Sequence, residues 1–305
     1  MWHQLSKRDF DTTGRLMGGR FASREWKVCE GYELTRPRDT SEGNADSYLV
    51  VPKYRYEPGT FGKWRSYEPL EETPDLFLKF ARLYQAQDRP EAMLEWARTY
   101  GTLGHPQPPW MPGAPQDAKG FWEAVERAAG LLALYEGVLN RDSQSVQRAL
   151  LKEFPYMGIW WSIYDEPPAP PADHGLMDLE FLASQIAEYV EEFYEGDYLG
   201  YTLETVADEV ERMVGTLCRP VLKVEEGSHD PSEVTAQWHF KSLLGAMYLQ
   251  MYWLMAAGSE LTRCEYCGRL ISLARPSPES RKRRRDKRFC DDACRQAHHR
   301  SKKKS

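Results

Sequence analysis

Two cysteine pairs near the end of the chain, Cys264-Glu-Tyr-Cys267 and Cys290-Asp-Asp-Ala-Cys294, decide how its C-terminal part folds. Together they offer four thiolates, the full tetrahedral complement of a structural zinc ion. A Cys-x2-Cys segment favours a tight turn that brings two sulfurs to one metal, and Cys-x3-Cys places two thiolates on one face of a helix. Because four thiolates leave no open coordination position, we expect one structural Zn2+ rather than a catalytic metal.

Two other interpretations of the four cysteines stay open, namely reduced thiols that bind nothing and a redox or iron site. Disulfides are disfavoured, because the first residues of the chain are not followed by the apolar run of a signal peptide. We therefore expect a cytoplasmic protein. The longest apolar stretch, residues 243–257, is short for a bilayer span and predicts a buried helix instead of a membrane anchor.

The segments around the cysteines predict a small zinc-clamped fold. Residues 269–274 and 287–290 have the composition of two hairpin arms, and a helix is expected from about Cys290. Asp291 and Asp292 then lie in its first turn and Lys302 in its last, where each charge complements the helix dipole. A turn, a hairpin and a helix that shares in binding the metal make up a treble-clef arrangement.

Basic side chains around the cysteines indicate a polyanionic partner. Between Arg263 and Ser305 the chain carries 15 Lys and Arg against 5 Asp and Glu, whereas residues 1–262 carry 25 against 41. Positive charge concentrated around a zinc-clamped segment is typical of nucleic-acid binding. The alternative is that the basic run is simply a solvated loop. The residues that we expect to contact nucleic acid are Arg281, Lys282, Arg283, Arg284, Arg285, Lys287, Arg288, Arg295, His299, Arg300 and Lys302.

Phosphate contacts alone explain this composition, and Arg295, Gln296 and His299 are the candidates for reading bases. His298 and His299 are expected on the exposed face of the helix. The opposite charges of the two parts of the chain also suggest an intramolecular contact between the acidic body and the basic tail.

Most of the remaining sequence has helical periodicity, so the predicted fold class is mainly α with a small β-containing N-terminal region and a C-terminal treble-clef-like zinc finger. The expected domains are 1–70, which is irregular with strands, 71–258, which is helical with a possible break near 165–173, and 259–305, the basic zinc finger. Expected helices span about 74–84, 90–100, 116–140, 143–154, 176–195, 202–217 and 232–257, with strands at 47–56 and 220–225.

Nothing in the sequence indicates catalysis. It lacks the nucleophile-elbow, phosphate-loop, zinc-protease and dinucleotide-binding motifs. Neighbouring carboxylates, such as Glu191 with Glu192 and Asp208 with Glu209 and Glu211, are expected on solvated helix faces. We therefore predict that the protein is not an enzyme, although an unrecognised activity in residues 1–262 stays open.

The tail resembles a known family. Cys264-x-x-Cys267-Gly-x-Leu-Ile, followed by Arg288-Phe-Cys290-x-x-x-Cys294-Arg-Gln, is similar to the CGNR-like C-terminal zinc fingers that follow a helical domain in presumed bacterial transcription regulators. The family's Cys-Gly-Asn-Arg signature is replaced here by Cys294-Arg-Gln-Ala. The resemblance implies DNA-binding regulation of transcription. The alternatives are an RNA- or ribosome-associated zinc protein and a protein–protein adaptor.

Overall fold

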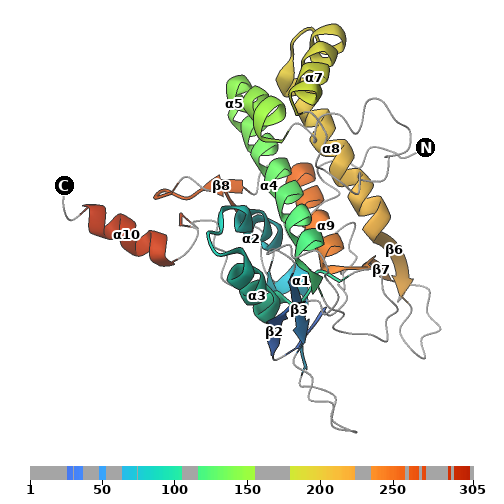
Figure 1. The fold of residues 1–305 in the computed structure, drawn as a ribbon, viewed down its shortest axis with the longest axis vertical. Coiled ribbons are helices and arrows are strands. Elements are labelled where there is room, and N and C mark those ends of the chain that lie inside the picture. Colours follow the sequence, from blue (N-terminus) through green and yellow to red (C-terminus); the bar gives the residue numbers. More distant parts are fainter. Residues whose placement is uncertain are drawn as a thin grey trace. The chain divides into compact units, whose positions relative to one another are not determined.

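The computed structural model describes residues 26–29, 31–36, 48–52, 64–73, 75–104, 116–154, 179–223, 235–257, 261–267, 270–272, 288–289 and 292–302. These residues are mostly helical, with a few small antiparallel sheets (Figure 1). The predicted mainly α class is confirmed. Strands among residues 26–67 agree with the predicted β content of the N-terminal region.

Helices account for most of the described chain. They are α1 (Pro69–Glu72), α2 (Leu76–Arg82), α3 (Arg89–Tyr100), α4 (Ala118–Asn140), α5 (Ser143–Arg148), α7 (Leu179–Tyr194), α8 (Tyr198–Leu217), α9 (Leu243–Ala257) and α10 (Asp292–Lys302). A 3-10 turn, Leu83–Gln85, follows α2, and a π-helical turn, Ala149–Glu153, follows α5.

The strands among the described residues are short and form four separate sheets. They are β1 (Trp26–Cys29), β2 (Tyr32–Thr35), β3 (Leu49–Pro52), β4 (Trp64–Tyr67), β5 (Gln116–Asp117), β6 (Cys218–Lys223), β7 (Thr235–Phe240), β8 (Leu261–Arg263) and β9 (Leu270–Ser272). Antiparallel pairs join β1 to β4, β6 to β7 and β8 to β9, and β3 lies between β2 and β5.

The chain divides into two compact units, one of residues 1–79, 87–121 and 213–305, the other of residues 80–86 and 122–212. In the first unit α3 packs on β1, β2 and β3. In the second unit α7 packs against the π-helical turn after α5. The predicted domain boundaries at 70 and 258 stay predictions, and the expected break at 165–173 lies outside the described residues.

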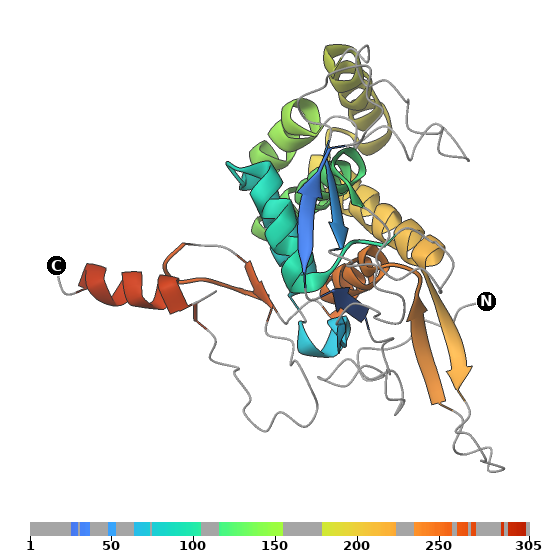
Figure 2. The same ribbon diagram turned by 60° about the horizontal axis from the view of Figure 1, so that its bottom comes forward.

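One predicted helix is partly wrong. Residues 232–257 were expected to be helical throughout, but 235–240 form strand β7, and α9 begins only at Leu243. The β7 sequence Thr-Ala-Gln-Trp-His-Phe has the β-branched and aromatic content of a strand. Its pairing with β6 in full register, Cys218 opposite Phe240, favours the extended form (Figure 2).

Helix α9 forms much of the core of the first unit. Leu243, Ala246, Met247 and Leu249 are completely buried. The helix is apolar around its whole circumference, which is the pattern of a buried helix. Its burial confirms the prediction for residues 243–257. Among the residues that the structure describes, none of the helices combines the length and the apolar character that crossing a bilayer requires.

Candidate metal centre and the basic helix beside it

The first cysteine pair lies in the turn of a short hairpin. Strand β8 ends at Arg263, strand β9 begins at Leu270, and these two residues are opposite each other in the ladder. The register therefore brings the chain back on itself around Cys264 and Cys267. Ile271, in β9, and Cys264, just after β8, are both buried.

This hairpin differs from the one expected. The sequence suggested that residues 269–274 pair with 287–290, whereas β9 pairs with β8. Of the expected partner arm, the structure describes Arg288 and Phe289, and neither is in a strand. A local hairpin closes a much shorter loop than pairing across residues 275–286, so its closure costs less conformational entropy.

Helix α10 follows the prediction for the segment after the second cysteine pair. It covers Asp292–Lys302, with Asp292 in its first turn and Lys302 as its last residue. Both charges complement the helix dipole. Cys294 and His298, one turn apart, belong to its less exposed side, whereas Arg295, His299 and Arg300 are exposed.

Three cysteine sulfurs converge where the hairpin meets α10. The Sγ atoms of Cys264, Cys267 and Cys294 all lie within 4.8 Å of one another. In a tetrahedral zinc site, Zn–S bonds of about 2.3 Å place the sulfurs about 3.8 Å apart, so the arrangement fits a thiolate-bound metal after a small contraction. Cys264 is buried, Cys294 is half-buried and Cys267 is exposed. Cys290, the fourth predicted ligand, lies outside the described residues.

The segment just before Cys290 is held against the first cysteine pair at two points. The backbone N–H of Glu265 donates a hydrogen bond of 2.9 Å to the carbonyl oxygen of Arg288. The guanidinium of Arg288 in turn donates two hydrogen bonds to the carboxylate of Glu265. These hydrogen bonds and the charge of Glu265 raise the pKa of Arg288, so the guanidinium stays charged.

An aromatic contact joins the same segment to α10. The ring of Phe289 lies 5.0 Å from that of His298, and His298 lies 6.1 Å from His299. The expectation that both histidines are exposed is therefore wrong for His298, which packs on Phe289, and is confirmed for His299. His298 lies four residues after Cys294, and residues four apart lie on the same side of a helix, so both belong to the less exposed side of α10.

The predicted nucleic-acid contacts fall into three groups. Arg288 pairs with Glu265, and Arg295 pairs with Asp292 at 3.0 Å. His299 and Arg300 are exposed, and Lys302 ends α10. The predicted contacts outside the described residues are Arg281, Lys282, Arg283, Arg284, Arg285 and Lys287.

Sequence reasoning missed both of these ion pairs. Asp292 and Arg295 are three residues apart on a helix, and this spacing predicts an ion pair between them. No comparable local signal exists for Glu265 and Arg288, because 23 residues separate them. Only the three-dimensional turn around the cysteines brings them together.

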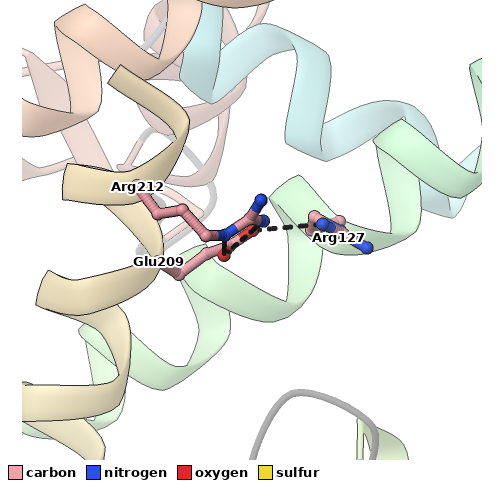
Figure 3. A network of polar contacts seen from close by, with 3 residues as sticks. All are labelled: Arg127, Glu209 and Arg212. Atoms are coloured by element: carbon pink, nitrogen blue, oxygen red, sulfur yellow. Dashed lines mark hydrogen bonds and ion pairs between the residues drawn. The ribbon is translucent and has the colours of Figure 1, made fainter. Parts of the chain in front are cut away.

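The second unit holds a different polar site, built on α4 and α8 (Figure 3). The carboxylate of Glu209 is 1% exposed and pairs with Arg127 at 3.3 Å and with Arg212 at 2.8 Å. The solvated position expected for Glu209 is therefore wrong. Val206 and Val210 are buried on the same side of α8, and this spacing was the available signal.

Burial raises the pKa of Glu209, while the two arginines oppose the rise. Each arginine remains partly exposed, so the network resembles a structural ion triad more than a catalytic site.

No protein-family model, curated protein or solved structure matches this chain. The features that bear on function are therefore the metal centre and the charges around it.

Proposed function

We propose that this protein is a nucleic-acid-binding regulator of transcription whose C-terminal zinc finger binds DNA. The observation that carries the proposal is the convergence of the Cys264, Cys267 and Cys294 sulfurs at the beginning of α10. Zn2+ held by these thiolates, with Cys290 as the fourth ligand, cross-links the β8–β9 hairpin to α10 in a treble-clef arrangement. Such a metal is structural, and its binding free energy stabilises the fold of the finger.

The exposed side of α10 favours DNA over RNA as the partner. This helix has 11 residues, and at 1.5 Å per residue it is about 16 Å long. The major groove of B-form DNA admits an α-helix, whereas that of A-form RNA is too deep and narrow for one. Its exposed side presents Arg295, Gln296, His299 and Arg300. Arg300 supplies charge to phosphate, while Gln296 and His299 supply groups that hydrogen-bond to base edges.

The metal is tested by elemental analysis of protein purified under reducing conditions. We expect about one equivalent of zinc per chain. Cys264→Ser and Cys294→Ser lower this content, whereas Cys218→Ser keeps it, because Cys218 is buried beside Gly245 and donates its S–H to that carbonyl oxygen. Equal zinc content in all three variants, or none in the wild type, contradicts the proposed metal site.

Nucleic-acid binding is tested with duplex DNA and duplex RNA of the same sequence over a range of salt concentrations. Each phosphate contact to B-form DNA contributes a slope of about −0.9 in log affinity against log salt. We expect tighter binding to DNA, and weaker binding after Arg300→Ala. A preference for RNA supports the ribosome- or RNA-associated alternative, and no binding to either polymer overturns the proposal.

A further inference from the structure

The three converging cysteines differ in their access to solvent. Cys264 is 2% exposed and Cys294 is half-buried, whereas Cys267 is exposed. Tyr266, the neighbour of Cys267 in the same turn, is 51% exposed, so the outer side of the turn faces solvent. A small solute can therefore reach one sulfur of the candidate metal centre in the folded protein.

An exposed sulfur that binds zinc is a nucleophile. Coordination holds a cysteine as its thiolate, the form that reacts with peroxides. Susceptibility to oxidation follows thiolate character together with exposure, and Cys267 is the most exposed of the three cysteines. Within the proposed metal centre, Cys267 is therefore the most reactive of these positions.

Two other sulfurs lie close enough to complete the oxidation. The Sγ atoms of Cys264 and Cys294 are within 4.8 Å of the Sγ of Cys267. An S–S bond is about 2.05 Å long, so one of these sulfurs has to approach Cys267 by about 3 Å at most. Redox-sensing cysteines often have such a resolving cysteine beside them.

We infer that Cys267 is a peroxide-reactive site whose oxidation releases the zinc. Its thiolate attacks hydrogen peroxide: an S–O bond forms, the O–O bond breaks, and the departing hydroxide takes up a proton to become water. The thiolate of Cys264 or Cys294 then attacks the Cys267 sulfur: an S–S bond forms, the S–O bond breaks, and a second hydroxide becomes water. The two sulfurs lose two electrons, which reduce the peroxide.

Disulfide formation removes two ligands of the metal. A thiolate binds zinc, whereas the uncharged sulfur of a disulfide does not. The binding free energy of a structural zinc ion is free energy of folding, so its loss weakens the attachment of α10 to the β8–β9 hairpin. Peroxide would in this way switch off the proposed DNA binding, on which this regulatory role depends, and a reductant with zinc would restore it.

Two cysteines outside the metal centre provide an internal control. Cys29 is 3% exposed and Cys218 is 4% exposed. The S–H of Cys218 donates to the carbonyl oxygen of Gly245 at 3.2 Å, and burial raises the pKa of this thiol to about 12. Both cysteines are therefore expected to stay reduced at peroxide concentrations that oxidise Cys267.

Trapping of the first oxidation product tests the site. Zinc-loaded full-length protein is treated with hydrogen peroxide in the presence of dimedone, which labels sulfenic acids, and peptide mass spectrometry locates the label. We expect the label on Cys267. Without dimedone, we expect a disulfide from Cys267 to Cys264 or Cys294, and unmodified Cys29 and Cys218. A first label on any other cysteine, a disulfide that lacks Cys267, or no oxidation overturns the inference.

A chromogenic chelator follows the metal in the same reaction. We expect the loss of about one zinc ion per chain as the disulfide forms, and its recovery after reduction and addition of zinc. Cys218→Ser, the matched control, should release zinc at the wild-type rate. Zinc that stays bound while Cys267 is oxidised overturns the inference, as does a release that Cys218→Ser abolishes.

DNA affinity, measured before and after oxidation, separates this site from the proposed function. We expect the affinity to fall to that of zinc-free protein. If the untreated protein binds no DNA but peroxide releases zinc through Cys267, the proposed DNA binding is wrong and the reactive site stands. If it binds DNA and peroxide leaves Cys267 and the zinc unchanged, DNA binding stands and the reactive site is wrong. DNA affinity that survives the release of zinc contradicts the regulatory role.

Discussion

The backbone N–H of Glu265 and the carbonyl oxygen of Arg288 are joined by a hydrogen bond of 2.9 Å, and their side chains form an ion pair beside it. Glu265 lies between two metal-binding candidates, and Arg288 is two residues before a third. The double link therefore joins the two halves of the finger through contacts that do not involve the cysteine sulfurs. It also occupies a guanidinium that the sequence assigns to phosphate.

Glu265→Gln should release Arg288 for nucleic acid. The substitution removes the competing carboxylate but keeps the backbone hydrogen bond, so the finger stays in place. We expect tighter DNA binding and a salt dependence that steepens by about 0.9, the value of one further phosphate contact. Salt-titrated binding measures both. In the E265Q/R288Q double variant the gain should vanish while the zinc content stays unchanged; a gain that persists contradicts a phosphate contact by Arg288.

Gln250 should be one of the most sensitive polar positions in the first unit. Its amide nitrogen donates to the carbonyl oxygens of Pro69, at 3.1 Å, and Thr73, at 2.7 Å, while its oxygen accepts from the N–H of Phe77 at 3.0 Å. Gln250→Leu leaves these backbone groups buried and unpaired, which should cost about 3 kcal/mol of unfolding free energy. Urea unfolding measures this. The control, Gln147→Leu on the exposed side of α5, should change stability by less than about 0.5 kcal/mol.

The case of Gln250 shows which parts of the structure the sequence predicts and which it does not. The apolar pattern of residues 243–257 predicts a buried helix, and α9 is one. A single glutamine in such a run gives no indication of its partners, which lie 173 to 181 residues away. Helices α3 and α4 were predictable within a few residues, because Pro90, Gly101 and the apolar periodicity mark them locally.

The metal site shows the same division. The spacing of the cysteines predicts a thiolate site, and three of the four sulfurs converge. The Glu265–Arg288 pair depends on the path of the chain between the two cysteine pairs, so local patterns do not reveal it. The β8–β9 hairpin is local, and its short loop was the signal that favours it over pairing with residues 287–290. For Glu209, the apolar spacing of α8 was a local signal of burial, but nothing local indicates its partner Arg127, which lies 82 residues away on α4.

Gly104 should not tolerate a side chain. Its φ is +71°, in the left-handed region, and an added Cβ would lie 2.7 Å from the indole ring of Trp26. Gly104→Ala combines backbone strain with a rigid aromatic neighbour and should cost about 2 kcal/mol. Thermal unfolding measures the loss. Gly215, in α8, has no atom within 4 Å of an added Cβ, and Gly215→Ala should stabilise the helix by about 0.5 kcal/mol. Equal effects in the two variants contradict the close approach to Trp26.

Removal of Arg212 should destabilise the protein in a pH-dependent way. Burial already raises the pKa of Glu209, and Arg212 is one of two cations that oppose the rise. The folded protein therefore holds a proton on Glu209 more readily than the unfolded chain does. As pH rises from the ordinary pKa of a glutamate through the raised pKa, the free-energy cost of burying the charged carboxylate appears, and it persists at neutral pH. Arg212→Met removes a partner of this charge and should cost about 3 kcal/mol near neutral pH.

At lower pH, as Glu209 takes up a proton, that cost should shrink, because a neutral carboxyl needs no cationic partner. Urea unfolding of the wild type and Arg212→Met at several pH values between about 5 and 8 measures the difference. The control is Arg148→Met, which removes an exposed partner of Glu153 and should cost less than about 1 kcal/mol over the whole range. A cost for Arg212→Met that is constant or grows in acid means that Glu209 is not the group that Arg212 stabilises.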